Sequence, residues 1–372
     1  MINVQNNLAS AGERISGLEG SLKAIQDDAS VIRANIRSIA EALGVPLGNP
    51  KELEKLIEER RLYEAAKREG KVVLYTTVDV RVAEAIKAGF ERKYPGITVE
   101  IVRGGPDALA RRFVSEFDRG VPYADVLHIG DYAAFFLVEK RRLMRYTPFT
   151  ADWLPVQYRD PDGYWYTDRV ILNGICYNTR AVSAQEAPKS YTELLDPKWT
   201  GRIATSDIRL TSVPVNLFVT LEKMFGTSFV EQLAKQKIAF FGTSFVDAIG
   251  RVVAGEFSLT LSAITLCEPR RIAGDPIDWV RFADNRYISF RPWNAIPANA
   301  PNPNAAKLLL NYLFTLEGQQ ILADAGHQPL HPQVRFANPD MSPANKQIIF
   351  IETLTGDALA AATNKYVKLF IG

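Results

Sequence analysis

The sequence predicts an α/β protein in which a parallel sheet is covered by helices on both faces. Two observations support this class. Strand-like and helix-like segments alternate from residue 71 onwards, and such βαβ alternation is typical of parallel sheets. The chain has 372 residues, of which 47% are hydrophobic, so it can bury a substantial core in two or more domains.

The expected elements follow from short apolar runs and from helix-breaking residues between them. Strands are expected at residues 72–75, 97–102, 125–129, 168–178 and 258–262. Helices are expected at residues 51–69, 81–94, 109–118, 132–141, 214–225, 229–236, 304–314 and 317–325. Pro95 and Gly96 illustrate the boundaries, since together they close the helix that begins at Arg81.

Residues 188–204, with the sequence PKSYTELLDPKWTGRIA, carry the most specific local signal. Ser190 followed by Glu193 is a capping box, in which each side chain bonds a backbone N–H at a helix start. Pro197 then ends the helix, because the residue before a proline is pushed out of the helical region. A turn and a strand from Arg202 follow, and Trp199 is expected in the packing.

Near the N-terminus, apolar residues alternate at spacings of three and four, which is the a/d pattern of a coiled coil. They are Ile15, Leu18, Leu22, Ile25, Ala29, Ile32, Ile36, Ile39 and Leu43. Residues 1–45 are therefore either a helix hairpin folded onto the main body or a helix through which the chain forms a homo-oligomer.

Composition excludes several classes of protein. The net charge is only +2 and no dense Lys/Arg run exists, so nucleic acid is not an expected partner. No run approaches about 18 apolar residues, the length of a membrane-spanning helix. The first residues lack the basic and apolar regions of a signal peptide, so the chain either follows a removed signal or is cytoplasmic.

Motifs for catalysis, cofactors and metals are also missing from the sequence. There is no P-loop, dinucleotide fingerprint or nucleophile elbow, so neither an enzyme nor a cofactor is expected. The histidines are too scattered for a metal site. Cys176 and Cys267 have no metal-type spacing; they could pair in an oxidising compartment, but two free core thiols are the expected state.

Residues 188–204 resemble the Y-x-x-L-L-D-P-K-W-K-G-K-I segment of family 1 extracellular solute-binding proteins, in the branch with the ferric-ion and aminophosphonate binders. Three further segments resemble the same family in the same order: ADVLHIGD at residues 124–131, AGEFSLTLSA at residues 254–263, and the helices in residues 304–323. The resemblance spans about residues 71–336. It implies a periplasmic solute-binding subunit that delivers a small molecule to the permease and ATPase of an ABC importer.

The resemblance also implies a two-lobed clamshell of the type II periplasmic-binding-protein class, closing on its ligand by hinge motion. Residues 71–170 and 286–345 would form lobe 1, and residues 171–285 lobe 2. A heptad helix (1–50), a linking helix (51–70) and a C-terminal helical segment (346–372) would be added to it.

In open α/β sheets, ligands bind beyond the carboxyl ends of the strands, which selects four loops here. Hydroxyl groups at helix starts suit anions, because the exposed N–H groups and the helix dipole favour negative charge. A carboxylate, phosphate or phosphonate is therefore expected, with Arg209 as a charged partner. The candidate residues are Thr76, Thr77, Asp79, Asp131, Tyr132, Thr205, Ser206, Asp207, Arg209, Ser262, Thr265 and Trp293.

Several alternatives remain at these positions. Asp79 and Asp131 fit helix N-caps better than ligand contacts, and Trp293 fits interlobe packing. If Asp79, Asp131 and Asp207 all face the cleft, the ligand is a polyamine-type cation. A ligand sensor built on the coiled coil is a further alternative. Ferric iron is not expected, because the positions that match the family's iron-binding tyrosine pair are Thr265 and Leu266.

Overall fold

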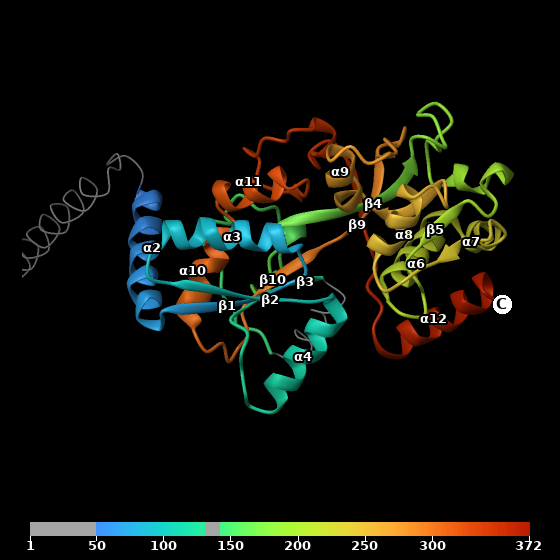
Figure 1. Ribbon diagram of the computed structural model, residues 1–372. Coiled ribbons are helices and arrows are strands. Elements are labelled where there is room, and N and C mark those ends of the chain that lie inside the picture. The colour runs from blue at the N-terminus through green and yellow to red at the C-terminus, as the bar shows by residue number, and fades with distance from the viewer. Residues whose placement is uncertain (1–49, 131–141) are drawn as a thin grey trace, which may run out of the picture. The chain divides into compact units, whose positions relative to one another are not determined.

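The computed structural model describes residues 50–130 and 142–372. It has two compact units that divide between Arg61 and Leu62, inside helix α2 (Pro50–Glu69). The predicted heptad helix, the predicted helix at 132–141, and the candidates Asp131 and Tyr132 lie outside the described residues. The unit from Leu62 to Gly372 contains both sheets, and each sheet defines one lobe (Figure 1).

Lobe 1 is built on a four-stranded sheet with the order β10-β3-β1-β2. Strands β1 (Lys71–Thr76), β2 (Thr98–Arg103) and β3 (Val126–Gly130) are parallel, whereas β10 (Pro292–Ala295) is antiparallel. Helices α3 (Val80–Lys93), α4 (Pro106–Asp118) and α10 (Pro303–Leu313) pack against these strands, and α11 (Leu316–Asp324) packs on α3. The predicted parallel α/β class is confirmed here.

Burial explains why this lobe forms as the sequence predicts. In β1, every residue after Lys71 is buried, as expected for a parallel strand with helices on both faces. Helix α3 buries Val82, Ala83, Ile86, Gly89 and Phe90, which form one stripe at helical spacing.

Lobe 2 is built on the second sheet, with the order β12-β9-β4-β7-β5-β6, and β8 and β11 also pair with β4. Its strands are β4 (Arg169–Asn178), β5 (Ile203–Thr205), β6 (Ala239–Phe240), β7 (Leu259–Ala263), β8 (Ile277–Trp279), β9 (Arg286–Phe290), β11 (Gln328–Pro329) and β12 (Gln347–Phe350). Its helices are α6 (Val213–Phe225), α7 (Thr227–Ala234), α8 (Phe245–Val253), α9 (Ile264–Ile272) and α12 (Gly356–Phe370).

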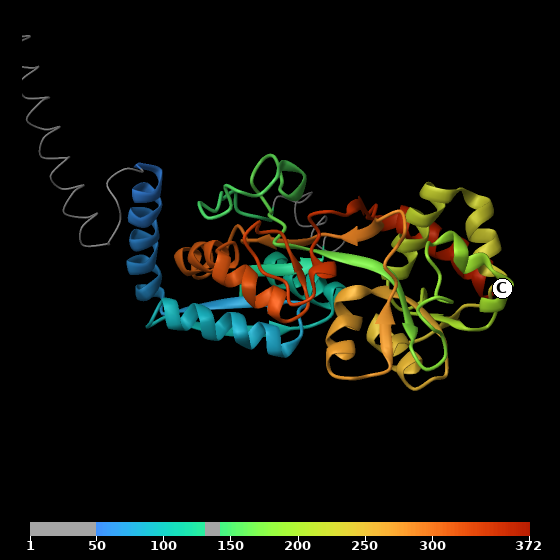
Figure 2. The same cartoon turned by 90° about the horizontal axis from the view of Figure 1, so that it is seen from above.

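Within the described residues, three segments run between the lobes: β4, the consecutive strands β9 and β10, and the chain from β11 to β12. Figure 2 shows the long green β4 and the orange β9 passing from one lobe to the other. The lobe boundary expected between residues 170 and 171 falls inside β4, and the one expected between residues 285 and 286 falls at the start of β9. The lobes are therefore joined by paired strands.

The segment 188–204 differs from its prediction at its start. Two short 3-10 helices, Thr192–Leu195 and Pro197–Trp199, replace the α-helix. The capping-box prediction is wrong: Glu193 accepts a hydrogen bond from the Lys189 N–H at 2.9 Å, and Ser190 bonds the Thr192 hydroxyl. Pro197 comes too soon for a full α-helical turn to form. Trp199 is 2% exposed, as its packing role requires.

The two cysteines form a disulfide, so the prediction of free thiols is wrong. Cys176 lies on β4 and Cys267 on α9, which packs against β4. The 91-residue separation hid this pairing, because proximity across the fold cannot be deduced from spacing. A disulfide is typical of proteins that fold in an oxidising compartment. Among the described residues, no helix is both long and apolar enough to span a bilayer.

We predict that replacing both cysteines with alanine lowers the free energy of unfolding by about 4–5 kcal/mol, the loop-closure value for about 90–100 residues. Urea unfolding followed by circular dichroism measures the change. The control is the effect of a reductant, which should destabilise the wild type and leave the double variant unchanged. Equal stability of the oxidised and reduced wild type would contradict the prediction.

Candidate functional site

Two buried serine hydroxyls lie at the carboxyl ends of adjacent strands in lobe 2. Strands β5 and β7 are parallel, with Ala204 opposite Thr260, and continuing this register places Ser206 beside Ser262. Both serines are 0% exposed, and neither hydroxyl has a hydrogen-bond partner among the described residues. An unsatisfied buried hydroxyl costs about 1–3 kcal/mol. Two of them side by side indicate a site that bonds something outside the chain.

Two helix starts adjoin these serines. Helix α9 begins directly after β7, and its N-cap, Ala263, offers no side chain to its free N–H groups. Thr265, in its first turn, is 4% exposed. Helix α6 follows the Ser206 loop, and the hydroxyl of its N-cap, Ser212, is also buried without a partner. Uncapped N–H groups and hydroxyls at this edge form an environment suited to an anion.

The lobe 1 candidates are engaged differently. Thr76 is fully buried, and its hydroxyl bonds His128 Nδ1 at 3.1 Å and accepts from the Val78 N–H at 3.2 Å. Asp79 is the N-cap of α3, accepting from the N–H groups of Arg81 and Val82. Thr77 is half-buried. Among these three candidates, Thr77 has no side-chain hydrogen bond within the loop.

In lobe 2, the other candidates also have internal partners. The Thr205 hydroxyl donates to the Leu261 carbonyl at 2.9 Å. Arg209 donates to both Asp207 oxygens, at 2.9 and 2.5 Å, and this hydrogen-bonded guanidinium lowers the pKa of Asp207. The expectation that Arg209 pairs with the ligand is therefore not supported by its contacts, because its charge is already matched inside the chain.

Most of the other arginines near strand ends are paired too. Arg270 bonds Asp275, and Arg271 bonds the buried carboxylate of Glu268. Arg103, at the end of β2, donates from Nε to the Val78 carbonyl at 2.9 Å. Among the described residues its Nη groups have no hydrogen-bond partner, so they can still contact an anionic ligand.

Trp293 packs between the crossing segments. It is 6% exposed and stacks on Trp165, with ring centroids 4.4 Å apart. The Arg291 guanidinium lies over Trp165 at 5.8 Å and over Phe350 at 4.5 Å. This arrangement matches the packing alternative for Trp293, because Trp165 covers one face of its ring.

The described residues contain no cluster of three or more His, Cys, Asp or Glu side chains that could hold a metal ion. The two positions that match the family's tyrosine pair, Thr265 and Leu266, lie in the first turn of α9. Neither side chain can supply a phenolate oxygen, so this part of the chain lacks the hard donors of a direct ferric site.

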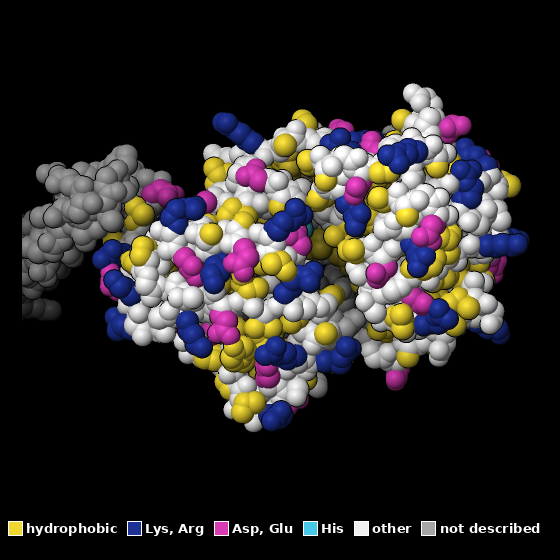
Figure 3. Space-filling model, viewed as in Figure 1, with side chains coloured by type: hydrophobic (Ala, Val, Ile, Leu, Met, Phe, Trp, Pro, Cys, Tyr) yellow, Lys and Arg dark blue, Asp and Glu magenta, His cyan; other side chains and the backbone are white. Residues whose placement is uncertain are grey.

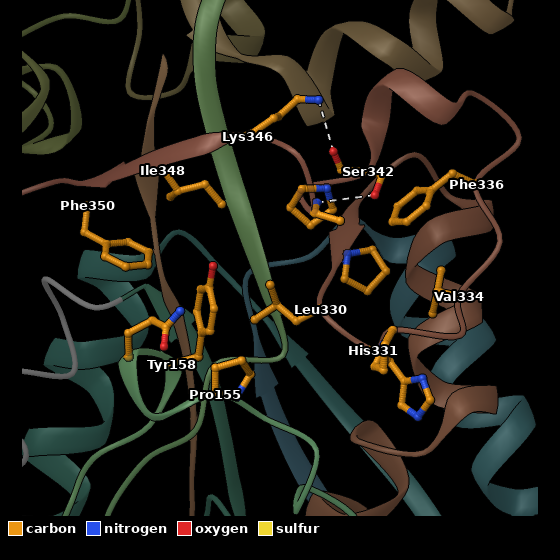
Figure 4. Close-up of a pocket in the computed structure, with 15 residues that line it drawn as sticks. Pro155, Tyr158, Leu330, His331, Val334, Phe336, Ser342, Lys346, Ile348 and Phe350 are labelled. Carbon is orange, nitrogen blue, oxygen red and sulfur yellow. Dashed lines mark hydrogen bonds between the residues drawn. The ribbon is translucent and has the colours of Figure 1, made fainter. Parts of the chain in front are cut away.

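A separate cavity of about 460 Å³ lies against the third crossing segment (Figure 4). Its walls are Pro155, Gln157, Tyr158, Pro329, Leu330, His331, Pro332, Val334, Phe336, Ser342, Pro343, Ala344, Lys346, Ile348 and Phe350. None of the residues predicted from the sequence lines it. Figure 3 shows a hollow between the two lobes, with Lys and Arg side chains on both sides.

The sequence correctly indicated that hydroxyl side chains lie at the ends of strands. It did not indicate which candidate side chains are already hydrogen-bonded inside the chain. Ser212 and Arg103 sit at strand or helix ends, where their residue types could have named them as site candidates. The pairing of Arg209 with Asp207 was within reach, since they are two residues apart.

Comparison with known proteins agrees with this geometry. A family model described as bacterial extracellular solute-binding protein matches residues 122–351. Iron uptake protein A1 of Synechocystis is 34% identical over 254 residues, covering 63% of this chain and 68% of that protein. The match covers more than half of the chain, so the chain is a solute-binding protein of the ABC-importer class.

Solved structures show the same fold. The periplasmic binding protein AfuA from Actinobacillus pleuropneumoniae, with exogenous fructose-6-phosphate bound, superposes with a TM-score of 0.68 at 18% identity, covering 81% of this chain and 99% of that one. Trichodesmium FutA in complex with iron and citrate ligands gives a TM-score of 0.64 at 21% identity, with 81% and 99% covered. The chain belongs to the bacterial extracellular solute-binding protein family and has its type II periplasmic-binding-protein fold. It is a binding protein, not an enzyme.

We predict that Asp79→Ala lowers the free energy of unfolding by about 1 kcal/mol, the usual effect of losing an N-cap. Chemical denaturation measures this. Asp79→Asn is the matched control, because asparagine also caps helices and should preserve most of the stability. An unchanged stability in Asp79→Ala would mean that the cap contributes nothing and would return Asp79 to the ligand candidates.

Proposed function

We propose that the chain captures a small organic anion, carrying a carboxylate, phosphate or phosphonate group, between its two lobes. The observation that carries this proposal is the pair of buried, unpartnered hydroxyls of Ser206 and Ser262 beside the uncapped start of α9. Hydroxyl and backbone N–H groups both donate to oxyanions, and helix starts favour negative charge. Arg103 and Thr77 would contact the ligand from lobe 1.

The same proposal includes delivery of the ligand to a membrane permease with its ATPase, and a periplasmic location. Family membership supports both, and the Cys176–Cys267 disulfide supports an oxidising compartment. A homo-oligomer through residues 1–45, and the alternative of a ligand sensor on that helix, stay predictions. The polyamine-type alternative is weaker, because Asp79 caps α3 and Asp207 is paired with Arg209.

A second candidate is ferric iron carried inside an organic-acid complex. It is favoured by the relative named for iron uptake and by the FutA structure with iron and citrate. In such a complex the organic acid supplies a cluster of oxygen donors, which the His, Cys, Asp and Glu side chains of the described residues do not form, while the protein binds the anionic shell. This candidate uses the same donor-rich edge as the first.

A thermal-shift screen, followed by calorimetry, separates the candidates. The screen compares citrate, inorganic phosphate, a phosphonate, ferric citrate and spermidine, and a ligand at a hundredfold excess over Kd stabilises by about 2.7 kcal/mol. Stabilisation by an iron-free anion supports the first candidate, and stabilisation by ferric citrate alone supports the second. One-to-one binding of ferric ion with a visible phenolate band would contradict both.

We predict that Ser262→Ala weakens binding of the strongest anion from that screen by about 1.5–3 kcal/mol, the value of a hydrogen bond to a charged group. The free variant should be as stable as the wild type or more stable, since an unsatisfied hydroxyl is removed. Ser289→Ala is the matched control: its buried hydroxyl donates to the Phe290 carbonyl at 2.8 Å, so it should lose stability and keep its affinity. Unchanged affinity in Ser262→Ala would remove this serine from the site.

A further inference from the structure

A buried polar cluster in lobe 1 has no part in the ligand contacts proposed above. It consists of Thr76, His128, Asp168 and Arg169, which are 0%, 0%, 0% and 1% exposed. Burying charged and polar groups is costly unless they bond one another, and a buried ion pair contributes little net stability even then. The cluster therefore calls for an explanation other than stability.

Its hydrogen bonds join the cleft loop to the crossing strand. The Thr76 hydroxyl accepts from the Val78 N–H and bonds His128 Nδ1 at 3.1 Å. His128 Nε2 lies 3.1 Å from Asp168 Oδ2 and is also bonded by Arg169 Nη1. Because a guanidinium only donates, Nε2 accepts, and the ring proton sits on Nδ1, from which it is donated to the Thr76 hydroxyl. A single neutral imidazole thus joins the loop after β1 to the Arg169–Asp168 pair at the start of β4.

Asp168 stands where the three crossing segments meet. Its backbone carbonyl accepts from the Leu330 N–H at 3.2 Å, just after β11, and Arg169 pairs in register with Pro329. Asn294 of β10 lies opposite His128 in the β3–β10 pair and donates to the Tyr166 carbonyl, two residues before Asp168, at 3.1 Å. A shift of Asp168 would therefore be transmitted to β4, to β10 and to the β11–β12 segment.

The charges around His128 keep this arrangement in one protonation state. Arg169 Nη1 lies against His128 Nε2 and donates to both Asp168 oxygens, at 3.1 and 2.9 Å. Burial and then Arg169 lower the pKa of His128. Burial alone would raise the pKa of Asp168, but Arg169 and His128 hold it below its usual value. His327, also buried close to this cluster, has a pKa lowered by burial to about 3.

We propose that His128 is a positioning residue that couples the cleft loop Thr76–Asp79 to the interlobe hinge, through Thr76 on one side and the Arg169–Asp168 pair on the other. Ligand contact with this loop and movement of the crossing strands then bias each other through one imidazole ring. The coupling itself is independent of the ligand's identity, and it rests on the proposed ligand site only for its role in capture.

Hydrogen exchange of the ligand-free, full-length protein tests the coupling, with mass spectrometry of the peptides that contain Val78 and Leu330. Thr76→Val removes the hydroxyl and keeps the shape of the side chain. We expect exchange to accelerate about tenfold at Val78 and also at Leu330, which donates to Asp168; a tenfold change corresponds to about 1.4 kcal/mol, within the range of coupled neighbours. Thr76→Ser, which restores the hydroxyl, should restore slow exchange at both sites.

The matched control is Thr205→Val, another fully buried threonine at the end of a parallel strand, whose hydroxyl bonds Leu261. It should leave Leu330 exchange unchanged. In a His128→Gln background, Thr76→Val should no longer affect Leu330, and if Thr76→Val does not fold, His128→Gln alone should accelerate both sites. Acceleration confined to Val78, or a Leu330 response that survives His128→Gln, would overturn the proposal. Because no ligand is used, failure here leaves the proposed function untouched.

Discussion

Strand β4 is the element on which the rest of this structure depends. Along its ten residues it pairs with β11, β9, β7 and β8 in turn, and it carries Cys176 of the disulfide. Each lobe has its own sheet, yet both are connected to this one strand. Any opening or closing of the lobes must therefore be accommodated by β4 and the two segments that cross beside it.

The buried polar groups fall into two kinds with different consequences. Thr76 bonds His128, and Arg169 of β4 bonds both His128 and Asp168, so these groups belong to the framework. Ser206 and Ser262 are as deeply buried, but their hydroxyls have no partner in the described chain. Because unsatisfied buried groups are rare in native proteins, the second kind is the better guide to where a ligand binds.

The chemistry of the donor groups refines what the relatives' names suggest. A relative named for iron uptake resembles this chain, but Thr265 and Leu266, the positions expected to match an iron-binding tyrosine pair, lie in the first turn of α9 and supply no phenolate oxygen. Hydroxyls, helix starts and the open Nη groups of Arg103 recognise oxyanions, not bare ferric ions. An anionic ligand, with or without iron inside it, reconciles the shared fold with this different set of donors.

The sequence by itself determined the α/β class, the alternation of strands and helices from β1 to β3, and the loops in which a ligand site could form, because these follow from local periodicity and from the rule for parallel strand ends. Only the tertiary structure decided which candidates are free. It paired Arg209 with Asp207, placed Asp79 on the start of α3, stacked Trp293 on Trp165, and joined Cys176 to Cys267. The physical reason is that a hydrogen bond or disulfide depends on which side chains meet in space, and residues such as Thr76 and His128 meet across 52 positions of chain that no local pattern connects.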